Sequence, residues 1–170
     1  MNNNLLILGA GGHGRVVKEI AESMRIFHKI DFLDDNPEFD GSIGICSDNK
    51  KFVSTYKFAF PAFGNKKMRM NFMEELMENG FEIPTLIHPT AFVSTSAFVD
   101  IGTVIGANAI VNTNSKIGEG CILSVGAIID HDVIIGGGCH IDCGAIVKSN
   151  SVIKVTEKIE SGKVVKCQED

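Results

Sequence analysis

Aliphatic residues recur at every sixth position through the second half of the chain, without a gap from Val93 to Ile153. A small or slim residue follows four positions after each of the first ten. A period of six fits neither an α-helix nor an alternating strand. It is typical of a parallel β-helix, in which three hexads form one triangular coil. An ordinary β-sandwich would not keep so strict a period. Ten full hexads over 93–152 predict a little over three coils.

The same phase continues toward the C-terminus, at Ile159 and Val165. There, however, Glu157 and Lys163 occupy the positions where earlier hexads have small residues. We therefore expect the regular hexads to fade after Ile153 and the last turn to be irregular.

The first half has the pattern of alternating strands and helices. Apolar runs at 5–8, 30–33, 58–60 and 83–87 predict strands. Apolar residues at helical spacing between Val16 and Met24 predict one helix, and a second begins at Gly64-Asn65 and ends near Gly80. We predict a small parallel α/β domain at residues 1–90, half of a dinucleotide-binding fold, followed by the β-helix at residues 91–170.

Composition supports two different cores in a globular chain. All eleven Phe and the single Tyr lie at or before Phe98. The 170 residues carry 16 Lys and Arg against 21 Asp and Glu, and no strongly basic patch, which disfavours nucleic acid as a partner. No apolar run reaches the ~20 residues of a membrane span, and the N-terminus lacks the basic start of a signal peptide. The five cysteines contain no C-x-x-C pair, so we expect a cytoplasmic protein without a structural metal site.

A glycine-rich segment after the first predicted strand indicates a phosphate-binding loop. Residues 9–14 match G-x-G-x-x-G, and the acidic pair Asp34-Asp35 follows about 20 residues later. Glycines let the backbone approach a phosphate, and the next helix presents free N–H groups to it. A tight turn without a ligand is the alternative. The domain is short for NAD, so a single nucleotide or the UDP end of a nucleotide sugar fits better.

The β-helix carries a candidate base at one of its corners. His131 is flanked by Asp130 and Asp132 and follows the inward Ile129, so it should point outward. A carboxylate beside an imidazole holds its tautomer and raises its basicity; the alternative is a solvated surface histidine. His140 is nine residues away, half of a coil, so the two histidines can meet only across copies of the chain. This spacing favours a symmetric oligomer with shared sites.

These motifs together resemble one family of bacterial hexapeptide acyltransferases. The matching segments are 8–14, 32–35, 63–65 with Arg69, 86–89, and 129–132 followed by His140 and Gly144-Ala145. They resemble the sialic acid O-acetyltransferases and the PglD-like UDP-4-amino-sugar N-acetyltransferases. The resemblance covers about residues 4–152. It implies a Rossmann-like domain followed by a left-handed β-helix, assembled as a homotrimer with acetyl-CoA between the β-helices.

The resemblance also implies roles for individual residues. His131 corresponds to the general base and Asp132 to the carboxylate beside it, while His140 corresponds to an acetyl-CoA contact. The loop residues Gly11, Gly12 and His13 correspond to contacts with the sugar-nucleotide phosphates. Three further positions correspond to the nucleoside contacts and to another substrate contact: Asp34, Asp35 and Gly64.

Two departures from the family pattern concern CoA. A backbone contact to CoA is expected at Ser149, where the family often has Gly. Family members also usually continue for further coils, so a chain whose hexads fade after Ile153 should offer less of a CoA groove.

The resulting hypothesis is direct acetyl transfer from acetyl-CoA to an amino or hydroxyl group of a nucleotide-linked or sialic-acid-type sugar. It needs a base, positioning and an oxyanion donor, but no protein nucleophile and no metal. Two alternatives remain: a non-catalytic nucleotide-sugar-binding relative, and a zinc enzyme resembling the γ-carbonic anhydrases.

Overall fold

The computed structural model describes residues 3–36, 39 and 41–166, and these form two compact units, Met1–Pro84 and Thr85–Asp170. The division falls six residues before residue 90, the predicted edge of the first domain. No helix of the described part is both long and apolar enough to cross a membrane.

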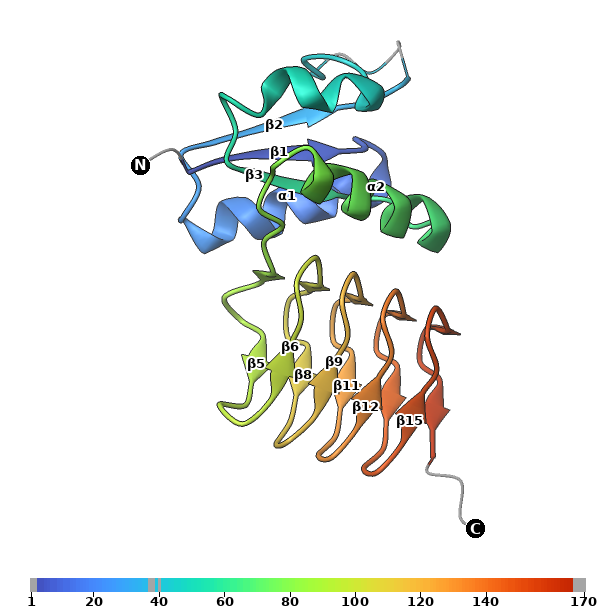
Figure 1. Ribbon diagram of the computed structural model, residues 1–170. Helices are drawn as coiled ribbons and strands as arrows, with labels where there is room; N and C mark the ends of the chain where they lie inside the picture. Colours follow the sequence, from blue (N-terminus) through green and yellow to red (C-terminus); the bar gives the residue numbers. More distant parts are fainter. Residues whose placement is uncertain (1–2, 37–38, 40, 167–170) are drawn as a thin grey trace. The chain divides into compact units, whose positions relative to one another are not determined.

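The first unit is built on a three-stranded parallel sheet with the strand order β2-β1-β3. Two α-helices and a 3-10 helix, η1, flank this sheet (Figure 1). The elements are β1 (Asn4–Leu8), α1 (Gly12–Met24), β2 (Lys29–Leu33), η1 (Cys46–Phe52), β3 (Phe58–Pro61) and α2 (Lys66–Glu78).

The predicted elements of this unit are confirmed, with the exception of the strand at 83–87. Strand β1 lies in the middle of the sheet, and its apolar run from Leu5 to Leu8 is fully buried. Helix α1 buries the side that carries Val17 and Ile20. Helix α2 begins where predicted, because the Asn65 side chain accepts the Met68 N–H at 3.0 Å and caps its first turn.

The second unit is a parallel β-helix, and its described residues, 85–166, contain fourteen two-residue strands that form three flat faces. Face 1 holds β4 (Leu86–Ile87), β7 (Val104–Ile105), β10 (Ile122–Leu123), β13 (His140–Ile141) and β16 (Lys158–Ile159). Face 2 holds β5 (Phe92–Val93), β8 (Ile110–Val111), β11 (Ile128–Ile129), β14 (Ile146–Val147) and β17 (Val164–Val165). Face 3 holds β6 (Phe98–Val99), β9 (Lys116–Ile117), β12 (Ile134–Ile135) and β15 (Val152–Ile153).

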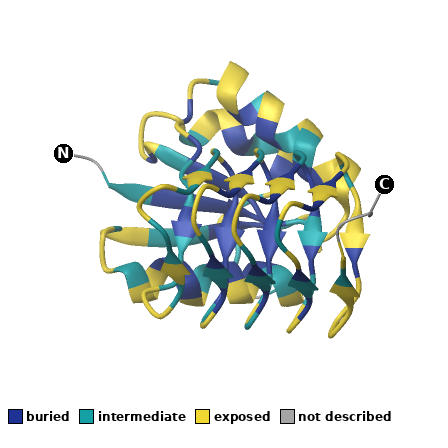
Figure 2. Cartoon of the chain, turned by 90° about the horizontal axis from the view of Figure 1, so that it is seen from below, coloured by how far each residue is buried: buried dark blue, intermediate teal, exposed yellow. Residues whose placement is uncertain are grey.

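Each strand pairs in register with the strand 18 residues later, as three hexads per coil require; Ile122, for example, pairs with His140. The second residue of each strand points inward, and Ile105, Ile117 and Ile129 are fully buried. Small residues such as Ala109 and Ala127 fill the remaining interior. Figure 2 shows exposed residues on the loops and also on a row of short strands, and buried residues in other strands. The six-residue period therefore predicted the core of this unit correctly.

Two expectations about the ends of the β-helix are wrong. Leu86 and Ile87 form β4 on face 1 rather than a last strand of the α/β unit. The reason is visible in the sequence: Ile87 is in phase with Val93, and Ala91 follows four residues later. The α/β sheet accordingly ends earlier than predicted.

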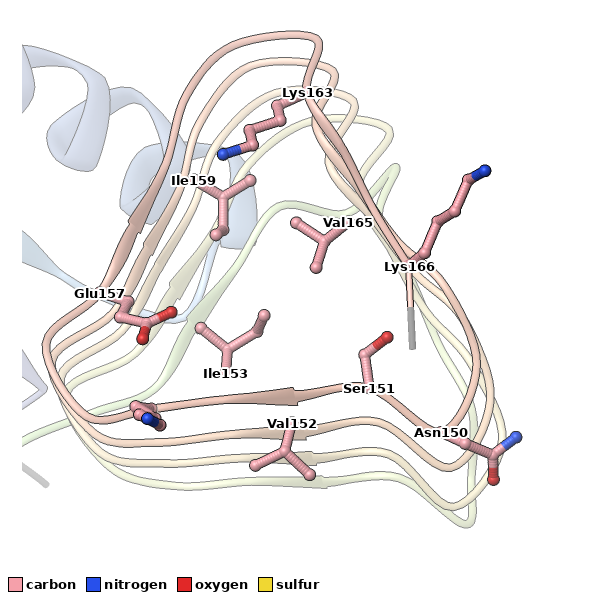
Figure 3. A pocket seen from close by; sticks show the side chains of 10 residues that line it. Asn150, Ser151, Val152, Ile153, Glu157, Ile159, Lys163, Val165 and Lys166 are labelled. Carbon is pink, nitrogen blue, oxygen red and sulfur yellow. The ribbon is translucent and has the colours of Figure 1, made fainter. Parts of the chain in front are cut away.

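The last coil is regular, since β16 pairs with β13 and β17 pairs with β14. Glu157 and Lys163 are tolerated there because both residues are exposed. They lie at the open end of the β-helix, and no further coil of the described residues covers them. Figure 3 shows Ile153, Ile159 and Val165 directed into the triangle. They line a cavity of about 520 Å³ together with these two charged residues.

Candidate active site

The glycines of the loop after β1 have two different functions in the structure. Gly9 has φ +95°, a conformation that favours glycine. A Cβ at Gly14 would lie 1.9 Å from the Gly9 carbonyl oxygen, so only glycine lets α1 pack this close to the loop. By contrast, a Cβ at Gly11 or Gly12 would meet nothing within 4 Å. Gly9 and Gly14 thus shape the loop, and Gly11 and Gly12 leave an open approach to it.

The start of α1 faces this open approach. Gly11 is its N-cap and provides no side-chain hydrogen bond to the first turn, where His13 is half-buried. Backbone N–H groups of a first helical turn have no partner within the helix, and the helix dipole favours an anion there. Gly11, Gly12 and His13 therefore lie where a phosphate group could be held.

Asp34 and Asp35 follow β2 and brace the neighbouring loops. The Asp34 carboxylate accepts hydrogen bonds from the N–H groups of Ala10 and Asn36, the second at 2.7 Å. Asp35 Oδ1 accepts the Cys46 N–H at 2.8 Å. Asp34 is half-buried and Asp35 is exposed. The acidic pair thus fixes the shape of the glycine loop and of the segment after β2, a role that the sequence reasoning did not anticipate.

Gly64 lies at the same edge of the sheet. Strands β1 and β3 are parallel, with Leu8 opposite Pro61, so the loops that follow them are neighbours. A Cβ at Gly64 would meet nothing within 4 Å. The buried Arg69 guanidinium holds this turn by donating to the Phe63 carbonyl at 2.7 Å and to the Gly64 carbonyl at 3.3 Å. The glycine loop, Asp34 and Gly64 therefore lie at one edge of the sheet.

His131 occupies an exposed corner of the β-helix between β11 and β12. Its Nδ1 lies 2.8 Å from Asp132 Oδ2. A carboxylate can only accept, so Nδ1 carries the hydrogen and the lone pair is on Nε2. The hydrogen bond to Asp132 raises the pKa of His131 above its usual 6.5, and the charges of Asp130 and Asp132 add to this effect. The pair has the geometry of a general base with an orienting carboxylate.

The residues around His131 fix its backbone. Asp130 Oδ1 accepts the His131 N–H at 2.8 Å. The pKa of Asp130 is lowered first by this bond, with a smaller contribution from the Ser149 backbone N–H. Ser149 itself is 18 residues after His131 and lies in the next coil, where the neighbouring Asn150 N–H donates to the His131 carbonyl at 3.3 Å. The Ser149 backbone amide, which was expected to contact CoA, therefore lies one coil after the candidate base and interacts with Asp130.

His140 lies in β13 on face 1, away from the corner that holds His131. Its Nε2 is 3.0 Å from Ser124 Oγ and 3.7 Å from Asp142 Oδ1. Sequence reasoning missed Ser124. The 18-residue period could have indicated it, because Ser124 stands one coil before Asp142. One chain therefore does not bring His131 and His140 together.

The cysteines and acidic residues provide no metal cluster within the described parts of the chain. No group of three or more His, Cys, Asp or Glu side chains is arranged there to bind an ion. Cys121 and Cys139 are fully buried in the β-helix, where their thiols donate to the carbonyls of Gly136 and Lys154. They are core residues of the β-helix. Cys143 is exposed.

Comparison with known proteins finds a family similar to the first unit. Residues 4–76 match the model of the PglD N-terminal domain family. This stretch of the first unit is therefore similar to PglD N-terminal domains. The glycine loop, the acidic pair and Gly64 all lie within the matched range of this domain.

A sequence relative extends the match beyond the PglD N-terminal domain. The UDP-N-acetylbacillosamine N-acetyltransferase of Bacillus subtilis (strain 168) is 32% identical in an alignment 106 residues long, which covers 58% of this chain and 49% of that protein. The match thus spans about half the length of this curated relative. The resemblance to PglD-like proteins that the motifs predicted is confirmed.

Solved structures confirm the predicted fold class, a small Rossmann-like parallel α/β unit followed by a parallel β-helix. A mutant perosamine N-acetyltransferase from Caulobacter crescentus, in complex with CoA and GDP-perosamine, superposes with a TM-score of 0.81 at 21% identity. The similarity covers 96% of this chain and 89% of that one. The acetyltransferase domain of PglB from Neisseria gonorrhoeae FA1090, in complex with acetyl coenzyme A, gives 0.67 at 26% identity, covering 98% and 92%.

Proposed function

We propose that this chain transfers the acetyl group of acetyl-CoA to an amino group of a nucleotide-linked sugar, with His131 as the general base. The observation that carries the proposal is the His131–Asp132 pair, held at an exposed corner with Nε2 opposite the carboxylate contact. The similarity to a UDP-N-acetylbacillosamine N-acetyltransferase favours an amine over a hydroxyl as the acceptor.

The proposed chemistry is a direct transfer between two bound substrates. The sugar nitrogen attacks the thioester carbonyl carbon and gives its proton to Nε2 of His131. The C–S bond then breaks, and the proton passes from the imidazolium to the CoA thiolate. The products are the acetamido sugar and CoA. Asp132 stabilises the imidazolium that forms between these steps.

The nucleotide is proposed to bind at the edge of the α/β sheet. Gly11, Gly12 and His13 would hold its phosphates at the start of α1. Asp34, Asp35 and Gly64 would contact the remainder of the substrate, with Asp34 also keeping the loop in shape. We propose UDP as the nucleotide. GDP is the alternative to test, because the perosamine enzyme was crystallised with GDP-perosamine.

The complete site is proposed to need a homotrimer. The outward residues of face 2 are all apolar: Phe92, Ile110, Ile128, Ile146 and Val164. Such a stripe on a flat face suits contact with further copies of the chain. Face 2 ends at the corner of His131, so a copy packed there could bring its own His140 near that base. Acetyl-CoA would then lie between two β-helices, with His140 and Ser149 among its contacts.

A cytoplasmic location is part of the proposal. The described cysteines, 46, 121, 139 and 143, are free thiols, which suits a reducing compartment.

Acetyl transfer by the purified protein tests the proposal. Release of free CoA is measured with acetyl-CoA and a panel of UDP- and GDP-linked 4-amino sugars, for the parent and for His131→Ala. The His131 side chain is 48% exposed, so its removal should leave folding and UDP binding unchanged. Activity should fall roughly 10²- to 10⁴-fold, the range for loss of a general base. Parental activity in His131→Ala would refute this role.

The two alternatives give different results in the same preparation. A non-catalytic nucleotide-sugar-binding relative would bind UDP or a UDP-sugar and release no CoA with any acceptor. A zinc enzyme resembling the γ-carbonic anhydrases would purify with near-stoichiometric zinc. Sialic acid as an acceptor tests O-acetylation.

A further inference from the structure

Asn114 lies in the corner one coil before His131 and contacts the carboxylate that holds the histidine. Its Nδ2 donates to Asp132 Oδ1 at 3.3 Å. The other oxygen of the same carboxylate, Oδ2, is the one 2.8 Å from His131 Nδ1. Asp132 therefore bridges an amide and an imidazole, with one oxygen for each.

The backbone of this corner fixes both ends of the Asn114–Asp132 contact. Asn114 and Asp132 have φ of 59° and 54°, a left-handed conformation that Asn and Asp tolerate better than most residues. The Asn114 N–H donates to Ser96 Oγ at 3.1 Å, and the Asp132 N–H donates to the Thr113 carbonyl at 2.9 Å. The stacked coils thus hold the Asn114 amide beside the Asp132 carboxylate.

Such a second contact matters because the His131–Asp132 pair is at the surface. Their side chains are 48% and 46% exposed, and exposed ion pairs contribute little since both partners retain other rotamers. A hydrogen bond to the second carboxylate oxygen removes part of that freedom before substrate binds. Electrostatic and general-base catalysis both depend on such preorganisation.

We propose that Asn114 is a positioning residue, which orients the Asp132 carboxylate and through it keeps the Nε2 atom of His131 directed to substrate. The catalytic part of this inference rests on the proposed function, whereas the effect on His131 itself does not. The charged groups that act on the imidazole are Asp130 and Asp132, both in its own corner. Lys148 is 18 residues after Asp130, in the next coil. None of these is changed by substituting Asn114.

The test compares Asn114→Gly with a matched variant, Asn108→Gly. Asn108 is also exposed and has φ 56°, but it lies at a different corner of the β-helix. Glycine adopts positive φ readily, so both variants should fold, with equal small losses of stability. The titration of His131 is followed by NMR of its ring carbon-bound protons, assigned with His131→Ala, and kcat and KM are measured across pH.

For Asn114→Gly, we expect the titration midpoint of His131 to move to lower pH, in the same direction as for Asp132→Asn but less far. The value of kcat should fall roughly 3- to 10-fold, the range for one exposed hydrogen bond, with KM for both substrates unchanged. Asn108→Gly should match the parent in both measurements. In the Asp132→Asn background, Asn114→Gly should add no further change, because the carboxylate that it positions is gone.

An unchanged His131 titration in Asn114→Gly would overturn the inference, as would a full additional loss in the Asp132→Asn background. An equal shift in Asn108→Gly would show a general effect of glycine at the corners and overturn it too. The titration needs no substrate. If no acceptor sugar is acetylated, the proposed function fails, and the role of Asn114 is still decided by the NMR midpoint.

Discussion

The glycine loop offers a pair of substitutions with opposite expected effects, Gly14→Ala and Gly12→Ala. Both add one methyl group to the first turn of α1. At Gly14 the new Cβ would lie 1.9 Å from the Gly9 carbonyl oxygen, whereas ordinary contacts begin at 3.4 Å. Helix and loop would have to separate by about 1.5 Å, the difference between these two distances. At Gly12 the methyl would meet nothing within 4 Å.

The energies follow from these distances. Separation at Gly14 would weaken the Gly9 N–H bond to the Leu33 carbonyl, now 2.8 Å, and the bond from the Ala10 N–H to Asp34. Forced overpacking of this kind costs about 1–3 kcal/mol or more, of which the better helix propensity of Ala returns up to ~1 kcal/mol. We therefore expect Gly14→Ala to lose about 2 kcal/mol of unfolding free energy. Gly12→Ala should keep or slightly exceed the parental value.

The assay separates stability from ligand binding. Urea denaturation gives the unfolding free energies, and the rise in Tm on adding UDP reports binding to the folded state. Gly12→Ala should melt like the parent but respond less to UDP, because its methyl occupies the approach to the helix N-terminus. NAD should raise the parental Tm much less than UDP. The reasoning is refuted if Gly14→Ala is as stable as the parent, or if Gly12→Ala responds to UDP like the parent.

The remaining predictions concern the β-helix. Only neutral His131 accepts a proton, so kcat should rise as the pH passes through the raised pKa of this residue. The substitution Asp132→Asn removes the carboxylate and lowers that pKa. The acid limb of the pH–rate profile should therefore shift to lower pH, and the maximal rate should be reduced. An unshifted limb would assign the profile to another group. His140→Ala should raise KM for acetyl-CoA with little change in that for the sugar, and an effect on the sugar alone would contradict its proposed role. Ile128→Asp on face 2 should convert the proposed trimer to 18.3 kDa monomers in light scattering, whereas Ile134→Asp, in the same coil on face 3, should not. A parent protein that is monomeric and still active would contradict an active site shared between copies of the chain.

Much of this fold could be predicted from the sequence because its order is local and periodic. An inward aliphatic in one hexad stacks on the residue 18 positions later, so the period alone places Ile105, Leu123 and Ile141 in one column. The same phase places His131 at an exposed corner and His140 half a coil away. The glycine motif predicted the strand–turn–helix segment equally well, since φ +95° at Gly9 restricts which residue can stand there.

Only the tertiary structure decided which residues act on one another. The motif does not distinguish Gly12 from Gly14, because the difference depends on the distance from α1 to the Gly9 carbonyl. The bracing role of Asp34 depends on a hydrogen bond across 24 residues. The contacts of Ser124 with His140, and of Asn114 with Asp132, join successive coils, where a shift of one residue would turn a side chain to the opposite side. The period placed these residues on neighbouring coils; the backbone geometry of each corner then decided which side chains meet.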